Sequence, residues 1–139
     1  MRNFWLISAI LISMNVHAQT AFTDIDYSGI YDCTGQDHLE GTYTGTVTID
    51  LVTAQSEGEY GAYLFKLEVP GYGVYPGHAA AHKKNMAIYF ANTDQTGKDF
   101  GTGIATFSKN KVGKWSFKKF YYEPEFKGGN FGKEFCIQR

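Results

Sequence analysis

The sequence has few cysteines, few prolines and no stretch with the periodicity of an amphipathic helix. Among its 139 residues are two cysteines and three prolines. Apolar residues nowhere recur at intervals of three and four over three helical turns, so a helical fold is not expected. After the N-terminal segment no apolar run is long enough to cross a bilayer as a helix, so no membrane span is expected.

Enzyme motifs and an overall basic charge are also missing. The sequence contains no Gly-x-Ser-x-Gly elbow, no phosphate-binding glycine loop and no His-Glu-x-x-His pair. Catalysis is therefore not indicated, and no cofactor is expected. The formal net charge is −1, so the chain does not have the basic character of a nucleic-acid-binding protein.

The first eighteen residues have the three-part pattern of a signal peptide. Arg2 supplies the positive charge, residues 4–12 form a short apolar run, and residues 16–18 resemble a small-x-small cleavage site. No cysteine stands at the cleavage position, so a lipid anchor is not expected. We therefore predict a cleaved signal peptide over residues 1–18, with periplasmic or secreted localisation.

Two cysteines in an exported chain usually form a disulfide. Cys33 and Cys136 would close a loop of about 100 residues, which stabilises the fold by about 4–5 kcal/mol in the chain-entropy model. A free catalytic thiol is disfavoured, because an oxidising compartment would pair it with the second thiol. We predict the Cys33–Cys136 disulfide.

The clearest strand pattern covers residues 42–53, where apolar and polar side chains alternate. Other strands are expected near residues 29–33, 60–69, 78–82, 86–91, 101–108, 114–122 and 130–138. Eight strands with hairpin-length links predict an all-β domain over residues 29–139, preceded by a lead-in segment over residues 19–28. A closed antiparallel up-and-down barrel is favoured over a two-sheet sandwich, because its first and last strands are neighbours and could carry the disulfide.

The aromatic content bears on the interior of this barrel. After residue 18 the chain holds ten phenylalanines, ten tyrosines and one tryptophan. Eight strands enclose a space that side chains can just fill, or that can keep one small ligand. We expect the rings to fill it.

Charge is distributed unevenly along the chain. Residues 19–97 contain three lysines and ten acidic residues, whereas residues 98–139 contain nine basic and four acidic residues. Because strands from both parts interleave in a rolled sheet, we expect solvated surface charges rather than one charged face.

Two segments are candidates for binding. Residues 34–41 and 71–77 are expected to be loops, and Tyr72 and Tyr75 stand on the glycine and proline frame of the second. Such tyrosines present a large area with few torsions to order. The aromatic and charged run at residues 120–127 is the other candidate. The predicted contact residues are Tyr72, Tyr75, His78, Tyr121, Tyr122 and Phe126.

Other constellations have simpler interpretations. His78 and His82 would lie about 13 Å apart along a strand, too far to share a metal ion. Residues 92–99 resemble the front of an EF-hand loop, but the bidentate glutamate is replaced by Gly103, so an Asx-rich turn is expected. The carboxylate pairs Asp24/Asp26 and Glu123/Glu125 give no reason to expect a buried acid with a raised pKa. No metal site is predicted.

In architecture, cysteine number and aromatic content the pattern resembles small exported barrels in general, such as lipocalin- and avidin-type ligand binders and small periplasmic lysozyme inhibitors. No signature motif of these families is present, so the resemblance assigns no functional residue. We predict a non-catalytic exported barrel that binds a macromolecular partner through loop aromatics, an inhibitor of an extracytoplasmic enzyme being one form of this function. The alternatives are a carrier of a small apolar ligand, and an enzyme using His78 or His82 with a nearby carboxylate.

Overall fold

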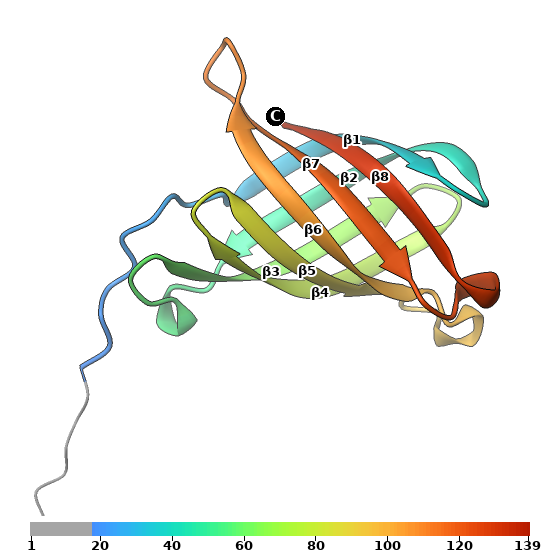
Figure 1. The fold of residues 1–139 in the computed structure, drawn as a ribbon, viewed down its shortest axis with the longest axis horizontal. Helices are drawn as coiled ribbons and strands as arrows, with labels where there is room; N and C mark the ends of the chain where they lie inside the picture. Colours follow the sequence, from blue (N-terminus) through green and yellow to red (C-terminus); the bar gives the residue numbers. More distant parts are fainter. Residues whose placement is uncertain (1–17) are drawn as a thin grey trace, which may run out of the picture.

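The chain folds into one closed barrel of eight antiparallel strands (Figure 1). The structure is a computed structural model that describes residues 18–139, so the predicted signal peptide lies outside the described residues except for Ala18. Within these residues no helix has the length and apolar character needed to cross a membrane. The strands are β1 (Gly29–Asp37), β2 (Gly41–Leu51), β3 (Tyr60–Val69), β4 (Gly73–His82), β5 (Asn85–Ala91), β6 (Phe100–Lys109), β7 (Trp115–Glu123) and β8 (Asn130–Gln138).

The first and last strands close the barrel and carry its covalent link. Each strand pairs with the next along the chain, and β8 pairs with β1. Cys33 and Cys136 are register partners in this last pair and form a buried disulfide. The predicted barrel topology and the predicted disulfide are both confirmed, and the two-sheet sandwich is not formed.

Aromatic side chains fill one half of the interior. Because side chains alternate across a strand, every second residue points inward, and on β2 this places Val47 and Ile49 in the core. Tyr31 of β1 lies against Phe117 of β7, with ring centroids 5.2 Å apart. Phe107 packs on both of these rings. This half of the barrel is a packed core.

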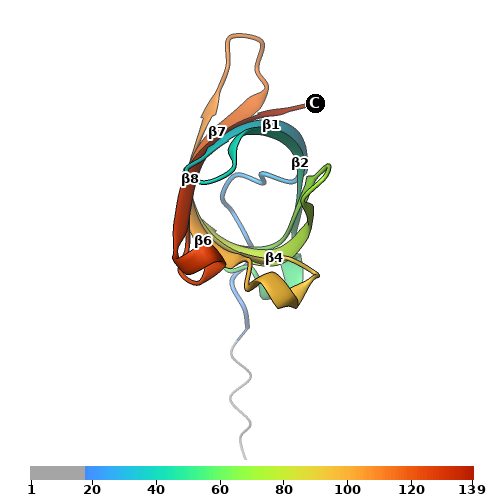
Figure 2. The same ribbon diagram turned by 90° about the vertical axis from the view of Figure 1, so that its right-hand side faces the viewer.

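The lead-in segment covers the end of the barrel next to this core. The Tyr27 ring is 1% exposed, stacks on Phe107 with centroids 4.0 Å apart, and donates a hydrogen bond from its hydroxyl to the Lys83 carbonyl. The Tyr63 hydroxyl donates to the Ile25 carbonyl at 3.1 Å. Figure 2, which looks through the barrel, shows residues 18–28 in blue crossing its far end.

The opposite end is open, and we call it the mouth. The connections β1–β2, β3–β4, β5–β6 and β7–β8 lie around it, at the right of Figure 1. The longest of these is the β5–β6 loop over residues 92–99, and the shortest are three residues long. The mouth is therefore the end at which the interior can meet another molecule.

Two predicted loops belong instead to strands. Residues 34–41 were expected to be a loop, but β1 continues to Asp37, because Gly35 and Asp37 extend its inward face and pair with both neighbouring strands. The predicted loop at residues 71–77 is also wrong. The turn is confined to residues 70–72, and β4 begins at Gly73 in continuous register with β3.

Candidate functional site

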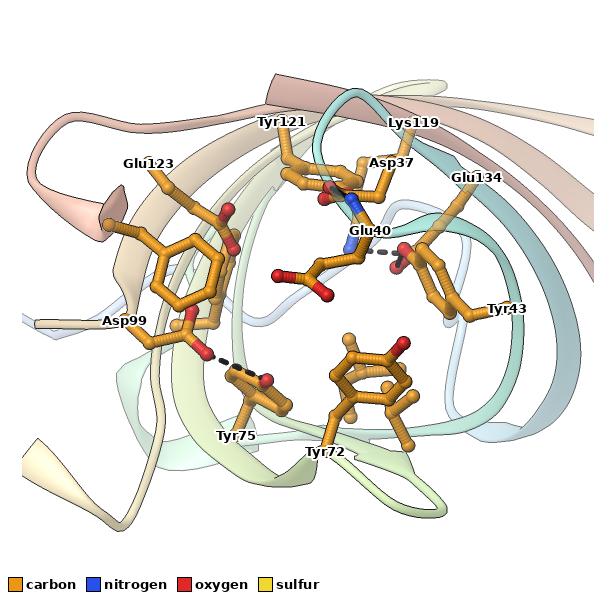
Figure 3. A pocket seen from close by; sticks show the side chains of 14 residues that line it. Asp37, Glu40, Tyr43, Tyr72, Tyr75, Asp99, Lys119, Tyr121, Glu123 and Glu134 are labelled. Atoms are coloured by element: carbon orange, nitrogen blue, oxygen red, sulfur yellow. Dashed lines mark hydrogen bonds and ion pairs between the residues drawn. The ribbon is translucent and has the colours of Figure 1, made fainter. Parts of the chain in front are cut away.

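A small cavity of about 50 Å³ lies inside the mouth, and its walls are largely acidic and aromatic (Figure 3). Tyrosines and carboxylates project into it from strands β1, β2, β4, β7 and β8 and from the connections at the mouth. One lysine, Lys119, joins them. The carboxylates are Asp37, Glu40, Asp99, Glu123 and Glu134, and the tyrosines are Tyr43, Tyr72, Tyr75 and Tyr121.

The deepest polar group of the cavity is a buried ion pair. The Lys119 ammonium on β7 lies 2.7 Å from a carboxylate oxygen of Glu134 on β8, and neither side chain is exposed. The Tyr43 hydroxyl donates a hydrogen bond of 2.5 Å to the other oxygen of Glu134. The ammonium also lies over the rings of Phe65 and Phe90, 5.2 and 5.4 Å from their centroids. Burial of this charge is thus compensated by a carboxylate and by aromatic faces.

Asp37, at the end of β1, is held by four donors. One carboxylate oxygen accepts the backbone N–H groups of Leu39 and Glu40, at 2.9 and 2.8 Å. The other accepts the Tyr121 hydroxyl at 2.6 Å and the Asn130 side-chain amide at 2.8 Å. Burial raises the pKa of Asp37, but these hydrogen bonds outweigh it and lower the pKa below its ordinary value.

Glu123, at the end of β7, has the opposite electrostatic environment. Its side chain is buried and accepts one short hydrogen bond from Asn130. Burial, the negative charges of Asp99 and Asp37, and a side-chain hydrogen bond to Asp99 raise its pKa to about 8, although the Asn130 hydrogen bond lowers it. The expectation of an ordinary pKa for the pair Glu123 and Glu125 is therefore wrong for Glu123, because strand alternation turns this residue into the barrel.

Asp99 enters the cavity from the β5–β6 loop. One of its oxygens accepts the Tyr75 hydroxyl at 2.8 Å and the Asn92 side-chain amide at 3.3 Å. Its other oxygen, Oδ1, is buried and has no N–H donor among the described residues, but Asp99 forms a side-chain hydrogen bond with the carboxyl group of Glu123. The rest of this loop is an Asx turn, as predicted, in which the Asp94 carboxylate accepts the Thr96 N–H.

Two glycines make room for two tyrosines of the cavity wall. Gly35 on β1 is the register partner of Tyr43, and Gly132 on β8 is the partner of Tyr121. A Cβ at Gly35 would lie 2.1 Å from the Tyr43 ring, and one at Gly132 would lie 2.2 Å from the Tyr121 hydroxyl oxygen. Each ring therefore lies flat over the strand beside it, which a side chain at the glycine would prevent.

Four of the six predicted contact residues come together at this cavity. Tyr72, Tyr75, Tyr121 and Phe126 all line it. Tyr75 and Tyr121 are buried, whereas Tyr72 is 48% exposed and Phe126 is half-buried at the rim. The other two, His78 and Tyr122, point away from the cavity and lie exposed on the outer face of the barrel.

The acidic residues and Lys119 were missing from the predicted site. Strand alternation in the sequence could have predicted two of them. Glu134 lies on the same strand face as Cys136, and Lys119 lies on the same strand face as Tyr121. Asp99 lies in a loop, where alternation gives no direction.

The histidines considered for catalysis lie elsewhere. The His82 imidazole, which is half-buried, stacks on the Tyr60 ring and lies 3.4 Å from a carboxylate oxygen of the exposed Glu59. His78 packs at an angle on Tyr89 on the outer face. Neither histidine lines the cavity at the mouth.

The cavity carboxylates do not form a cluster of metal ligands. Among residues 18–139, the one group of three ligand-type side chains with atoms within 4.8 Å of one another is Cys33, Glu134 and Cys136. Both sulfurs of that group belong to the disulfide, so they are not thiolate ligands. The mouth therefore offers acidic and aromatic groups that surround a space, rather than ligands that converge on one ion.

Comparisons with known proteins add no relative to this description. No family model, no curated protein and no solved structure matches the chain.

Proposed function

We propose that this protein is an exported, non-catalytic binding protein that holds a protein partner at the mouth of the barrel. The observation that carries the proposal is the convergence of Tyr72, Tyr75, Tyr121 and Phe126 on one cavity at the open end. The other end is covered by the chain's own lead-in segment. The Cys33–Cys136 disulfide is compatible with an extracytoplasmic location.

The size of the cavity favours one inserted side chain over a whole ligand. Pockets that enclose drug-sized molecules are about 300–1,000 Å³, and the cavity here is about 50 Å³. Its walls carry buried acidic groups, which an apolar ligand would leave without partners. The geometry therefore supports a protein partner better than it supports a carrier of a small apolar ligand.

The rim of the cavity supplies surface for the rest of such a partner. Tyr72 in the β3–β4 turn and Phe126 in the β7–β8 connection are exposed or half-buried aromatic side chains beside the cavity. Short turns and a disulfide-closed barrel keep these rings in place before binding, which reduces the entropy lost on association. A partner enzyme whose active site faced this rim would be blocked, which is the inhibitor form of the proposal.

Partner capture with two matched double variants tests this function. The full exported chain, with its disulfide formed, serves as bait in an extract of envelope and secreted proteins. Tyr72→Ala with Phe126→Ala removes the rim, whereas Tyr89→Ala with Tyr122→Ala removes two exposed tyrosines from the outer face. All four side chains are at least partly exposed, so both variants should fold.

We expect at least one protein to be recovered by the original chain and by the outer-face variant, and to be lost with the rim variant. Circular dichroism and thermal unfolding of both baits check that they fold. Equal recovery by all three folded baits, or loss only with the outer-face variant, would refute binding at the mouth.

A further inference from the structure

The polarity of β8 is the reverse of that of a solvated strand. An antiparallel strand that covers a core normally turns its apolar side chains inward and its polar side chains toward water. In β8 the inward positions include Asn130 and Glu134, which are buried. The outward positions hold Phe131, Phe135 and Ile137, and all three side chains are exposed. Three large apolar side chains of one strand are therefore uncovered.

The neighbouring strands extend this apolar surface. Ile104 on β6 is the register partner of Phe120 on β7, and both side chains are exposed. The Phe120 and Phe131 rings have centroids 6.4 Å apart, and Tyr122 is the register partner of Phe131. We call the outward side chains of β6, β7 and β8 the side face. Contiguous exposed apolar side chains of this kind are typical of an interaction surface.

The charge of the side face has one sign. Lys118 on β7 and Lys133 on β8 are exposed among the aromatic rings, as the register partners of Phe135 and Phe120. Of the described residues that point outward from these three strands, none is acidic. Neither lysine forms an ion pair within residues 18–139. The charge of this face therefore complements an anionic surface.

The β6–β7 hairpin adds a basic arm with an apolar tip. It continues its two strands beyond the barrel, at the end opposite the mouth, and stands clear of the other connections (Figure 1 and Figure 2). Lys109, Lys111 and Lys114 are exposed along it, and none of them forms an ion pair with another described residue. Val112 at the tip is 78% exposed. In the sequence, residues 100–122 contain five lysines and no acidic residue.

We propose that the side face and the β6–β7 hairpin dock on an anionic phospholipid bilayer, so that the barrel lies on the membrane surface. The lysines contact the anionic headgroups, while the phenylalanine rings and Val112 bury apolar area at the boundary with the acyl chains. The mouth is at the other end of the barrel from the hairpin and stays free. This membrane docking goes beyond the proposed binding of a partner at the mouth.

Other occupants fit the side face less well. A second copy seated face to face would bring Lys118 and Lys133 of both chains together, without an acidic side chain of this face to pair with them. A folded acidic protein would need a hollow that matches the outward curve of a closed barrel. A bilayer interface adapts to projecting rings, and aromatic side chains beside lysines are the composition that binds it.

Co-flotation with lipid vesicles tests the docking. The exported chain is used with its disulfide formed, and mass spectrometry confirms that residues 1–18 are removed, so that the apolar run at residues 4–12 does not contribute. Vesicles of equal parts of phosphatidylglycerol and phosphatidylcholine are compared with vesicles of phosphatidylcholine alone, at low and at high salt. Polyglutamate serves as a soluble acidic polymer, and analytical ultracentrifugation gives the oligomeric state.

One pair of double variants tests the apolar contacts. Ile104→Ser with Phe120→Ser reduces the apolar character of the side face. Tyr60→Ser with Leu64→Ser is the control, because these exposed side chains lie on β3, across the closed barrel from β7. All four positions are exposed, so both variants should fold, which circular dichroism and thermal unfolding check.

A second pair tests the charge. Lys111→Gln with Lys114→Gln removes two positive charges from the hairpin. Lys66→Gln with Lys98→Gln is the control with the same net charge, because the ammonium groups of Lys66 and Lys98 already pair with carboxylates outside the side face. The comparison therefore separates the position of the charge from its total.

We expect binding to the phosphatidylglycerol vesicles, at least about tenfold weaker at high salt, and no binding to phosphatidylcholine alone. A lysine near an anionic surface contributes about fivefold, so the hairpin variant should bind at least about tenfold more weakly. The side-face variant should also lose at least about tenfold. Both control variants should stay within about twofold of the original chain.

Brominated acyl chains report which side of the barrel meets the bilayer. The fluorescence of Val112→Trp should be quenched by vesicles with brominated lipid, whereas that of Leu64→Trp should not. Equal quenching at the two positions would overturn docking by this face. So would equal binding to phosphatidylcholine alone, binding to neither vesicle, or equal loss in the control variants. Capture of polyglutamate without vesicles, or a dimer that Ile104→Ser with Phe120→Ser dissociates, would replace the bilayer by that other occupant.

Discussion

Tyr121 on β7 lies directly across from Gly132 on β8, and its hydroxyl occupies the space that a side chain at position 132 would need. The hydroxyl donates to Asp37, which lies 84 residues away in the sequence, on β1 at the other side of β8 in the closed barrel. The glycine, the tyrosine and the aspartate therefore act as one unit that orients the polar wall of the mouth.

Gly132→Ala should disturb this unit. The new methyl group would force the Tyr121 ring to move and would weaken its 2.6 Å hydrogen bond to Asp37. We expect a loss of about 1–2 kcal/mol in the free energy of unfolding, measured by urea denaturation. Gly97→Ala is the control, because nothing lies within 4 Å of a Cβ at Gly97, and it should change stability by less than about 0.5 kcal/mol. Equal stability of the two variants would contradict this role of Gly132.

The buried ion pair between Lys119 and Glu134 should depend on both partners. Lys119→Met leaves a buried carboxylate whose hydrogen bond from Tyr43 is the remaining favourable contact. We expect this variant to lose about 3–5 kcal/mol of stability. Lys119→Met combined with Glu134→Gln removes both charges and should recover most of the loss. Chemical denaturation at pH 7 gives the coupling energy, and additive effects of the two substitutions would refute the pairing.

Stability should decrease with rising pH because of Glu123. Its pKa is about 8 in the folded state and has an ordinary value of about 4.5, so between these values the folded chain holds a proton that the unfolded chain has lost. The free energy of unfolding should therefore fall as pH rises through this window, by up to about 1.4 kcal/mol per pH unit, and level off above pH 8.

Glu123→Gln isolates this contribution. Denaturation of both proteins at pH values from 5 to 9 gives the difference in their stabilities, in which contributions shared by the two chains cancel. The variant should gain stability relative to the original chain as pH rises. Asp37, whose pKa is lowered, acts in a separate window below about pH 4. A stability difference that stayed constant from pH 5 to 9 would rule out a raised pKa at Glu123.

The barrel was predictable because period-two alternation and the cysteines agree. The pattern at residues 42–53 defines a strand with one apolar face, and the disulfide requires that the strands holding Cys33 and Cys136 be neighbours. The ends of β1 and β4 were not predictable in the same way. Glycines and a proline at residues 70–77 have the composition of a loop, yet pairing with β3 keeps them in a strand.

The site was only partly predictable, because both faces of β7 and β8 carry aromatic rings. Hydrophobicity alone would turn Phe131 and Phe135 inward, but they are exposed and Glu134 is buried. The disulfide indicates which face of β8 points into the barrel. Cys136 is buried on the inner face, and alternation places Glu134, two residues earlier, on the same face. That Asp37, Asp99 and Glu123 meet at one end depends on strand register, which no local pattern specifies.

The uneven charge of the sequence has a related explanation. Three of the four acidic residues in 98–139 are Asp99, Glu123 and Glu134, and all line the cavity. Most lysines of the same segment are exposed. The charges of this segment are thus divided between the inside and the outside of the barrel. The prediction of solvated surface charges holds for the exposed lysines of this segment, but not for Lys119 or for these acids.

Removal of the disulfide should destabilise the barrel without changing its topology. Cys33 and Cys136 are separated by 103 residues, so the bond restricts most of the unfolded chain. We expect Cys33→Ala with Cys136→Ala to lose about 2–5 kcal/mol of the free energy of unfolding. The β1–β8 ladder itself remains, because seven register pairs join these strands independently of the sulfurs. Urea denaturation of the oxidised chain and of the double variant measures the loss, and hydrogen exchange follows the β1 and β8 amides. Global loss of strand structure at zero denaturant would show that the ladder cannot close the barrel alone.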